Sequence, residues 1–142
     1  MVYTMRNDRW ETRDTISLAR VVKNDAYVTL ATANGKIFAC SADDAKVFVL
    51  SQSGEVMQTH GKPGSDRAGE LNNPRLCAVD SEESMLVADC DNDRLQVCDR
   101  HGQWSVLDLQ PPVTEPVGAA VIDNKLYVCS YSEKTLSVYA SE

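Results

Sequence analysis

One short pattern occurs three times along this chain, and this repetition constrains the fold more than any other feature. The pattern is an apolar run, a polar loop and an alternating strand, and its clearest copy covers residues 85–98. It also matches, without a gap, residues 37–50, which lie 48 positions earlier, and residues 126–139, which lie 41 positions later. Repeats of about 40–50 residues with several short strands each are typical of β-propellers. The sequence therefore predicts an all-β propeller with blades of four-stranded antiparallel sheets.

Turn signals extend each copy of the pattern into a blade. In the first repeat, Asn34 and Gly35 tolerate the positive φ angles of a two-residue hairpin turn and separate the first two strands. In the second repeat, alternation predicts strands at 75–79, 85–88, 94–98 and 103–107. The third repeat ends without a fourth strand. We expect about three blades, over residues 24–64, 74–110 and 116–142, with a long polar connection at 61–73.

Residues 1–23 match no part of the repeats and are treated as a separate N-terminal segment. Within them, residues 10–13 and 15–19 alternate weakly, so either stretch is a candidate edge strand for a blade. A frayed chain terminus fits the same sequence equally well. The sequence leaves both interpretations open.

The formal net charge of −7 arises entirely in the second half of the chain. Residues 74–142 contain twelve Asp or Glu and five Lys or Arg, whereas residues 1–73 contain nine of each. An acidic surface repels phosphate backbones, so this balance argues against nucleic-acid binding. No stretch approaches the roughly 20 apolar residues of a membrane span, and no N-terminal run resembles a signal peptide. We therefore expect a cytoplasmic protein without membrane contact.

The five cysteines show no metal-binding spacing, because none of them forms a C-x-x-C pair. Cys40 and Cys129 occupy the same repeat position, where the second repeat has Ala88. An exchange between Cys and Ala indicates a small buried residue rather than a disulfide partner. We expect all five thiols to be reduced and structural.

The second repeat combines a Pro, an apolar strand, an Asp-containing loop and a Gly turn. The residues concerned are Pro74, Ala78, Val79, Asp80, Leu86, Val87, Ala88, Asp89, Asn92, Arg94, Leu95, Gln96, Val97, Asp99 and Gly102. They resemble the NHL repeat, the propeller unit of tripartite-motif NHL proteins and of many other proteins. The polar positions differ in the other repeats, which have Ser41, Asp44 and Lys46 in the first and Ser130, Glu133 and Thr135 in the third.

The resemblance implies a ring of six blades, of which this chain supplies half. An open half-ring exposes unpaired strand edges and an apolar blade face. A second copy would complete the ring, with the spare N-terminal strand pairing as the missing outer strand after Tyr139. A different partner that supplies a complementary propeller half, or a longer polypeptide, would complete it as well. We expect a homodimer, because the spare strand favours the first arrangement.

Ligands and partners of propellers tend to meet loops on one face of the ring. The loops between second and third strands cover residues 41–45, 89–93 and 130–134. They predict an acidic, aromatic-containing docking face for a basic protein segment, formed by Asp43, Asp44, Asp91, Asp93, Tyr131 and Glu133. For Asp89, Asn92 and Arg94 we favour a structural role, because Asp and Asn side chains commonly bond backbone groups in turns.

The sequence assigns no catalytic, cofactor-binding or metal-binding residue. His60 and His101 lie at expected outer-strand ends, whereas NHL-like amidating lyases hold metal through a set of His residues that this chain lacks. Asp89, Asp91 and Asp93 have the spacing of a calcium loop, but the Gly and the distal Glu are missing. Motifs for nucleophilic catalysis and phosphate binding are also absent from the sequence.

These observations favour a non-enzymatic NHL-type propeller module for protein–protein interaction that completes its ring by self-association. An RNA-binding NHL domain is the first alternative, and a metal-dependent propeller lyase or hydrolase is the second. The RNA-binding alternative requires a cluster of basic side chains, for which the candidates are Arg6, Arg9, Arg13, Arg75 and Arg94.

Overall fold

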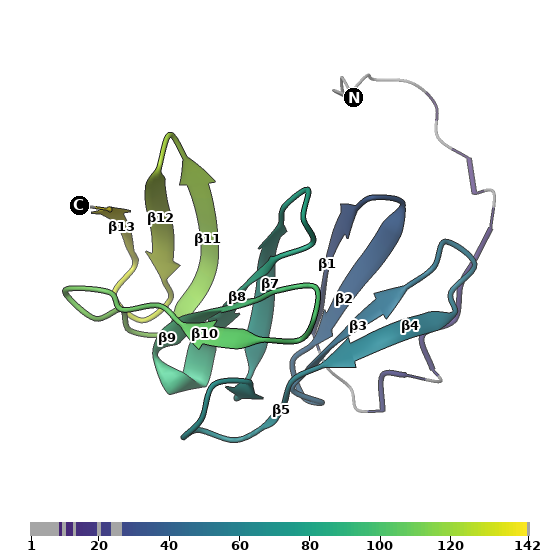
Figure 1. Cartoon of the computed structure of the whole chain (residues 1–142), viewed down its shortest axis with the longest axis horizontal. Coiled ribbons are helices and arrows are strands. Elements are labelled where there is room, and N and C mark those ends of the chain that lie inside the picture. Colours follow the sequence, from purple (N-terminus) through teal and green to yellow (C-terminus); the bar gives the residue numbers. More distant parts are fainter. Residues whose placement is uncertain (1–8, 10, 13, 20, 24–26, 142) are drawn as a thin grey trace.

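The computed structural model describes residues 9, 11–12, 14–19, 21–23 and 27–141. Three antiparallel sheets follow one another along the chain and stand side by side, as Figure 1 shows from right to left. The first blade has the strand order β1-β2-β3-β4. Its strands are β1 (Val28–Ala33), β2 (Lys36–Ser41), β3 (Lys46–Leu50) and β4 (Val56–His60). The predicted all-β propeller architecture is confirmed.

The second blade also has four strands, and the third has three. The second contains β7 (Pro74–Val79), β8 (Met85–Asp89), β9 (Arg94–Cys98) and β10 (Trp104–Val106), with a short 3-10 helix η1 (Cys90–Asn92) between β8 and β9. The third contains β11 (Pro116–Ile122), β12 (Lys125–Ser130) and β13 (Thr135–Ala140). No helix in the part of the chain that the structure describes is long and apolar enough to cross a membrane.

The connection between the first two blades is more ordered than the sequence indicated. Its two-residue strands β5 (Lys62–Pro63) and β6 (Glu70–Leu71) pair in parallel. Leu71 is fully buried and joins the apolar cluster between the blades. The expected polar loop at 61–73 is therefore a folded element that fills the space between neighbouring blades.

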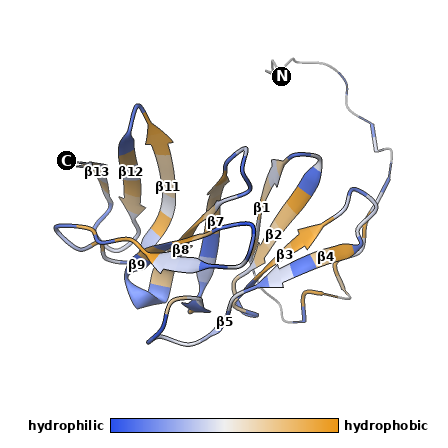
Figure 2. Cartoon of the chain, in the orientation of Figure 1, coloured by the Kyte–Doolittle hydropathy of each residue, from blue (hydrophilic) through white to orange (hydrophobic). Residues whose placement is uncertain are grey.

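The core consists of layers between blades. Blade 1 contributes Phe38, Cys40, Val47 and Val49 to the first layer, and blade 2 contributes Leu76, Met85, Val87 and Cys98. The second layer, between blades 2 and 3, contains Leu86, Ala88, Leu95, Val113 and Val128. In Figure 2 the hydrophobic colour follows the strands that supply these layers. Because strand side chains alternate between faces, blade 2 buries one face against blade 1 and the other against blade 3.

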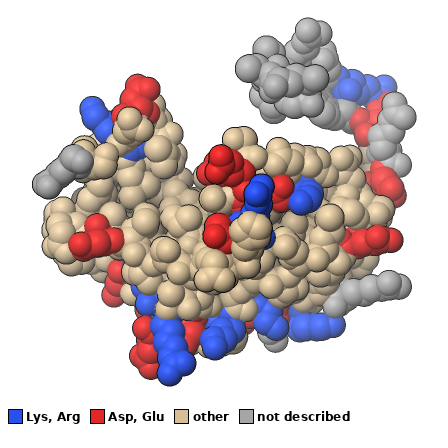
Figure 3. Space-filling model, in the orientation of Figure 1, with Lys and Arg blue, Asp and Glu red and all other residues tan. Residues whose placement is uncertain are grey.

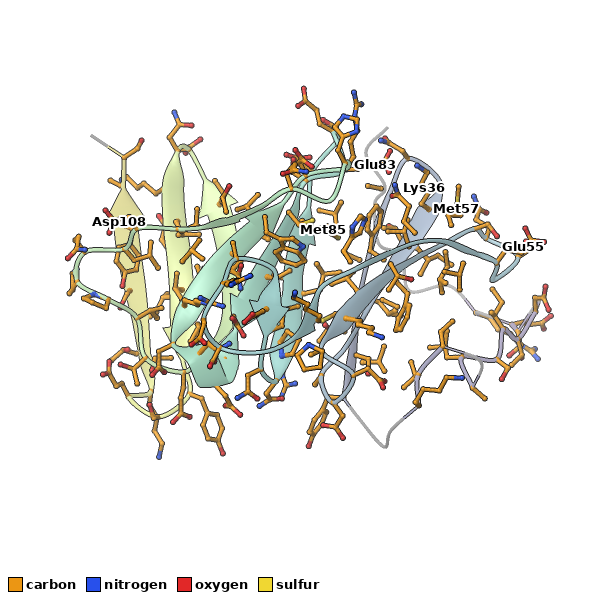
Figure 4. All side chains as sticks on the ribbon, turned by 60° about the horizontal axis from the view of Figure 1, so that its bottom comes forward. Lys36, Glu55, Met57, Glu83, Met85 and Asp108 are labelled. Carbon is orange, nitrogen blue, oxygen red and sulfur yellow. The ribbon has the colours of Figure 1, made fainter. Side chains whose placement is uncertain are left out.

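A salt bridge ties blades 1 and 2 together at the edge formed by their first hairpin turns. Lys36 Nζ lies 2.8 Å from Glu83 Oε1, and Asn34 Nδ2 donates to Glu83 Oε2 at 3.2 Å. Figure 4 shows Lys36 and Glu83 reaching toward one another from the two blades. These bonds lower the pKa of Glu83, with the Lys36 contact as the main cause. Polar contacts at the edge thus add to the apolar layer between the same blades.

The described part of the N-terminal segment covers the outer face of blade 1. Leu18 and Val21 pack against the layer formed by Ala39, Phe48 and Leu50. Residues 15–19 form no strand within this chain, which differs from the candidate edge strand predicted there. The second candidate, residues 10–13, includes Trp10 and Arg13, which lie outside the described residues.

Candidate functional site

The loops between second and third strands lie along one edge of the blades, with the β5–β6 connection beside them at the bottom of Figure 1. Backbone and side-chain contacts join the connection to the loop of blade 2. Asp91 N donates to Asn72 O at 3.1 Å, and Asn92 Nδ2 donates to Gly64 O at 2.9 Å. This edge is the loop face of the propeller.

Asp89 organises the loop face from inside the protein. Its side chain is fully buried, and Oδ2 accepts hydrogen bonds from Asn92 Nδ2 at 2.9 Å, Arg94 Nε at 2.8 Å and Gln96 Nε2 at 3.0 Å. Oδ1 accepts a bond from Asn72 N at 2.8 Å. A buried carboxylate with four donors and an ionic partner is fully satisfied. Asp89, Asn92 and Arg94 therefore build the loop, in agreement with the structural role favoured from the sequence.

Gln96 belongs to the same network, although it is a polar residue in an alternating strand. It is fully buried, and its side chain holds the β5–β6 connection through Glu70 O and Gly69 N, both at 2.9 Å. Arg94 Nη2 donates to the same Glu70 carbonyl at 2.8 Å. The burial of Gln96 was not evident from the sequence, because a polar residue that alternates with apolar ones in a strand is also typical of a solvent-exposed face.

Two of the predicted docking residues are bound to the protein's own backbone or loop. Asp44 Oδ2 accepts from Ser41 Oγ at 2.6 Å and from Lys23 N at 3.1 Å. Asp93 Oδ1 accepts from Glu115 N at 2.8 Å and so ties blade 2 to the entrance of blade 3. These carboxylates stabilise loops.

Two other predicted residues, Asp43 and Asp91, line a hollow of about 730 Å³ on the loop face. Tyr27 and Arg75 also line it, and the Arg75 guanidinium carbon lies 4.9 Å from the centroid of the Tyr27 ring. This distance is typical of a cation–π contact. The hollow combines acidic side chains with an arginine on an aromatic ring.

Tyr131 and Glu133 are exposed on the loop of blade 3 and do not line this hollow. Along the lower edge of Figure 3, Lys and Arg side chains stand beside Asp and Glu side chains. The described loop face therefore carries both signs of charge, and its charge alone does not select a basic partner. Of the six predicted residues, the structure brings Asp43 and Asp91 together.

The histidines and cysteines show no metal-binding arrangement among the residues that the structure describes. No group of three His, Cys, Asp or Glu side chains there could hold a metal ion. His60 is half-buried against blade 2, and this burial lowers its pKa. Burial raises the pKa of Cys40 and of Cys98 to about 12, so both are neutral thiols at ordinary pH.

The described candidates for an RNA-binding patch have other partners. Arg94 is held by Asp89 inside blade 2, and Arg75 lies over the ring of Tyr27. Arg9 Nη2 pairs with Glu11 Oε1 at 3.3 Å. Arg6 and Arg13 lie outside the described residues.

A second candidate surface is the outer face of blade 3. Tyr127, Cys129, Leu136 and Val138 point to this face, because their neighbours Leu126, Val128 and Tyr139 pack against blade 2. Leu136 is 61% exposed and Val138 is 53% exposed. Cys129 is exposed too, which contradicts the expected burial of this repeat position. Its equivalent Cys40 is buried because blade 2 covers it, and no described part of this chain covers blade 3.

The outer edge of blade 3 also lacks a paired strand in the described part of the chain. The third strands of blades 1 and 2 pair on both sides, whereas β13 pairs only with β12 in the described structure. An open strand edge presents backbone N–H and C=O groups that another strand can pair with. Blade 3 therefore has both an open apolar face and an open edge.

Known proteins resemble this chain in fold. No protein-family model matches the sequence, and no curated protein matches it. Among solved structures, catalytically inactive virginiamycin B lyase from Staphylococcus aureus with quinupristin superposes with a TM-score of 0.57 at 11% identity. The alignment covers 84% of this chain and 43% of the lyase, so this chain spans less than half of that protein.

Two further structures give similar results. BamB from Moraxella catarrhalis has a TM-score of 0.54 at 21% identity, over 79% of this chain and 30% of BamB. The computationally designed Ika4 protein has a TM-score of 0.51 at 14% identity, over 93% of this chain and 100% of Ika4. At these identities the similarity establishes the fold. The chain is a β-propeller protein.

Proposed function

We propose that this chain is an NHL-type half-propeller that acts as a non-enzymatic protein–protein interaction module in the cytoplasm, with a second copy of itself as its first partner. Two copies with three blades each would form the six-bladed ring. One observation carries this proposal. The open face of blade 3 repeats, position for position, the faces with which blades 1 and 2 pack against the blades that follow them.

The repeated face has four positions in each blade, two on the second strand and two on the third. The sets are Phe38, Cys40, Val47 and Val49 in blade 1, Leu86, Ala88, Leu95 and Val97 in blade 2, and Tyr127, Cys129, Leu136 and Val138 in blade 3. The first two sets pack between blades. A contiguous apolar surface of this kind on the third blade is typical of a protein interface.

The matching surface lies at the other end of the same chain. The face of blade 2 that receives blade 1 contains Met85, Val87, Gln96 and Cys98, and the same repeat positions in blade 1 hold Ile37, Ala39, Phe48 and Leu50. The chain therefore carries both halves of an interblade layer, one at each end. Leu18 and Val21 already lie over Ala39, Phe48 and Leu50 of blade 1. The blade 3 face of one copy would therefore pack on these two side chains together with the blade 1 face of the next copy, as blade 1 and Leu71 together pack on blade 2.

The loop face is our candidate for the docking of a further protein. Its hollow contains the carboxylates of Asp43 and Asp91, the Arg75 guanidinium and the Tyr27 ring. It therefore offers negative, positive and aromatic groups to a partner. Tyr131 and Glu133 extend the same edge onto blade 3. A completed ring would present two such edges around one channel.

Light scattering behind a sizing column tests self-association. We expect a mass near twice 15.6 kDa for the unaltered chain. Leu136→Asp places a charge on the open face and should give a monomer, whereas Met57→Asp, at an exposed apolar position on β4, should leave the dimer intact. In the dimer, Cys129 should also resist alkylation. A monomer at all concentrations, with Cys129 freely alkylated, would overturn the proposal.

A further inference from the structure

We propose that residues 14–19 are the fourth strand of blade 3 of a second copy, pairing with the open edge of β13. This inference rests on the proposed self-association for the identity of the partner. It identifies the strand that joins the two chains and its register. It also explains why Ile16 and Leu18 lie against blade 1.

Ile16 and Leu18 of the N-terminal segment lie on blade 1 where the fourth strand of a preceding blade would lie. Gly54 and Gly102 occupy the same repeat position, in the turns that follow β3 and β9. A Cβ added to Gly102 would come within 3.2 Å of His60 Nδ1, the last residue of β4 in the blade before. A Cβ added to Gly54 would collide with Ile16 Cγ2. Ile16 therefore has the position on blade 1 that His60 has on blade 2.

The spacing along the chain supports this equivalence. His60 precedes Pro74, the first residue of β7, by 14 positions, and Ile16 precedes Val28, the first residue of β1, by 12. The connections that enter blades 2 and 3 each bury one apolar side chain in the layer before that blade, namely Leu71 and Val113. The segment that enters blade 1 contributes Leu18 and Val21 to the corresponding layer.

The exposure of residues 15–19 alternates as in a strand. Ile16 and Leu18 are half-buried toward blade 1, whereas Thr15, Ser17 and Ala19 are exposed. Side chains of a strand point to opposite faces in turn, so this pattern fits a blade edge with one packed face. Residues 14–19 pair with none of the described strands of their own chain, and the partner's β13 would supply a free edge.

Repeat positions give the register of the proposed pairing. In blade 1, β3 pairs with β4 through Val47 and His60 and through Phe48 and Thr59. The positions that match Val47 and Phe48 in blade 3 are Leu136 and Ser137. With Ile16 at the position of His60, the pairing places Ile16 opposite Leu136 and Thr15 opposite Ser137. Ile16 of one copy and Leu136 of the other then both face blade 1 of the copy that contributes Ile16. Thr15 and Ser137 face away from this blade.

Disulfide trapping between two different single variants tests this register. Thr15→Cys and Ser137→Cys are each made in a Cys129→Ala background, since Ala88 shows that the repeat position accepts alanine. The two proteins are mixed, dissociated and reassociated before mild oxidation, so that any bond between positions 15 and 137 joins two copies. Glu11→Cys replaces Thr15→Cys in the control mixture. Light scattering of the unmodified chain is measured in parallel.

We expect a 15–137 disulfide in the mass spectrum, at least about tenfold more abundant than the control bond, because Cα atoms more than about 7 Å apart are not bridged. A dimer by light scattering with equal trapping from positions 11 and 15 would overturn the strand pairing and leave the self-association standing. A monomer would overturn both.

Discussion

At the scale of single residues, one repeat position carries a buried polar group in every blade. Ser41, Asp89 and Ser130 share this position at the end of the second strand, and all three are buried. Ser41 Oγ bonds Asp44 and Ser130 Oγ bonds Thr114 O, both at 2.6 Å. Asp89 extends this role, because its second oxygen and longer side chain allow it to accept four hydrogen bonds.

Replacing Asp89 with alanine should therefore destabilise the protein strongly. Asp89→Ala removes the buried carboxylate that pairs with the partly buried Arg94 and accepts hydrogen bonds from Asn92, Gln96 and Asn72, at a cost of about 3 kcal/mol or more. Asp91→Ala, at an exposed position, should stay within about 0.5 kcal/mol of the unaltered chain. Urea denaturation at one protein concentration measures both. A difference of less than about 1 kcal/mol between the two variants would contradict this account.

The repeat alignment contained more information about the loop residues than their types alone. Asp44 occupies the position of Asn92, and both bond the buried polar residue three positions earlier. Asp93 occupies the position of Ala45, and both adopt a positive φ, 53° and 54°. Comparison across repeats therefore predicts a structural role for Asp44 and Asp93. The charge of these residues and their position in a loop could not predict this role, since an Asp is the same letter in the sequence whether its carboxylate faces inward or faces solvent.

At the scale of elements, local patterns located the strands well. In blade 2 the predicted strands at 75–79, 85–88 and 94–98 differ from β7, β8 and β9 by at most one residue at either end. Alternation and turn residues are local signals, so they mark strands directly. The β5–β6 pair was missed because Arg94 and Gln96 of a distant strand hold it in place.

Equivalent leucines in two blades should differ in their contribution to stability. Leu95 is fully buried between blades 2 and 3, whereas Leu136, at the same repeat position, is 61% exposed. Leu95→Ala should cost about 3 kcal/mol of folding free energy. In dilute monomer, Leu136→Ala should cost less than about 1 kcal/mol.

Leu136 should matter more for the association of two copies than for the folding of one. Leu136→Ala should raise the dissociation constant of the dimer about tenfold, because it truncates a side chain at the centre of the proposed interface. Chemical denaturation and analytical ultracentrifugation separate the two effects. Equal folding costs for Leu95→Ala and Leu136→Ala in the monomer would contradict the exposure of the blade 3 face.

At the scale of the whole molecule, the chain is a row of blades in which each blade packs on its sequence neighbours. The two ends of the row differ, since Leu18 and Val21 cover one end face and no described residue covers the other. Each copy carries a net charge of −7. Bringing two copies together therefore opposes apolar attraction with electrostatic repulsion.

Salt should strengthen the proposed dimer. Ions screen repulsion between the two acidic chains, and the apolar end faces need no ion pair to associate. We expect the dissociation constant to fall roughly threefold to tenfold between about 0.05 M and about 0.5 M sodium chloride. Sedimentation equilibrium measures this change. Weaker association at high salt would indicate an interface held by ion pairs, in conflict with the residues assigned here.

The two unlike end faces also determine which assembly the proposed self-association gives. Unlike faces join head to tail, and such contacts give a closed ring only when the rotation per chain divides a full circle; otherwise they continue as a helical fibre. Closure with two copies requires each blade to turn by about 60° relative to the last. The apolar layers of Phe38, Met85, Leu95 and Val128 set that angle inside the chain. In the proposed self-association, core packing thus decides between a closed ring of two copies and a filament, so an altered core side chain could convert the ring into a fibre.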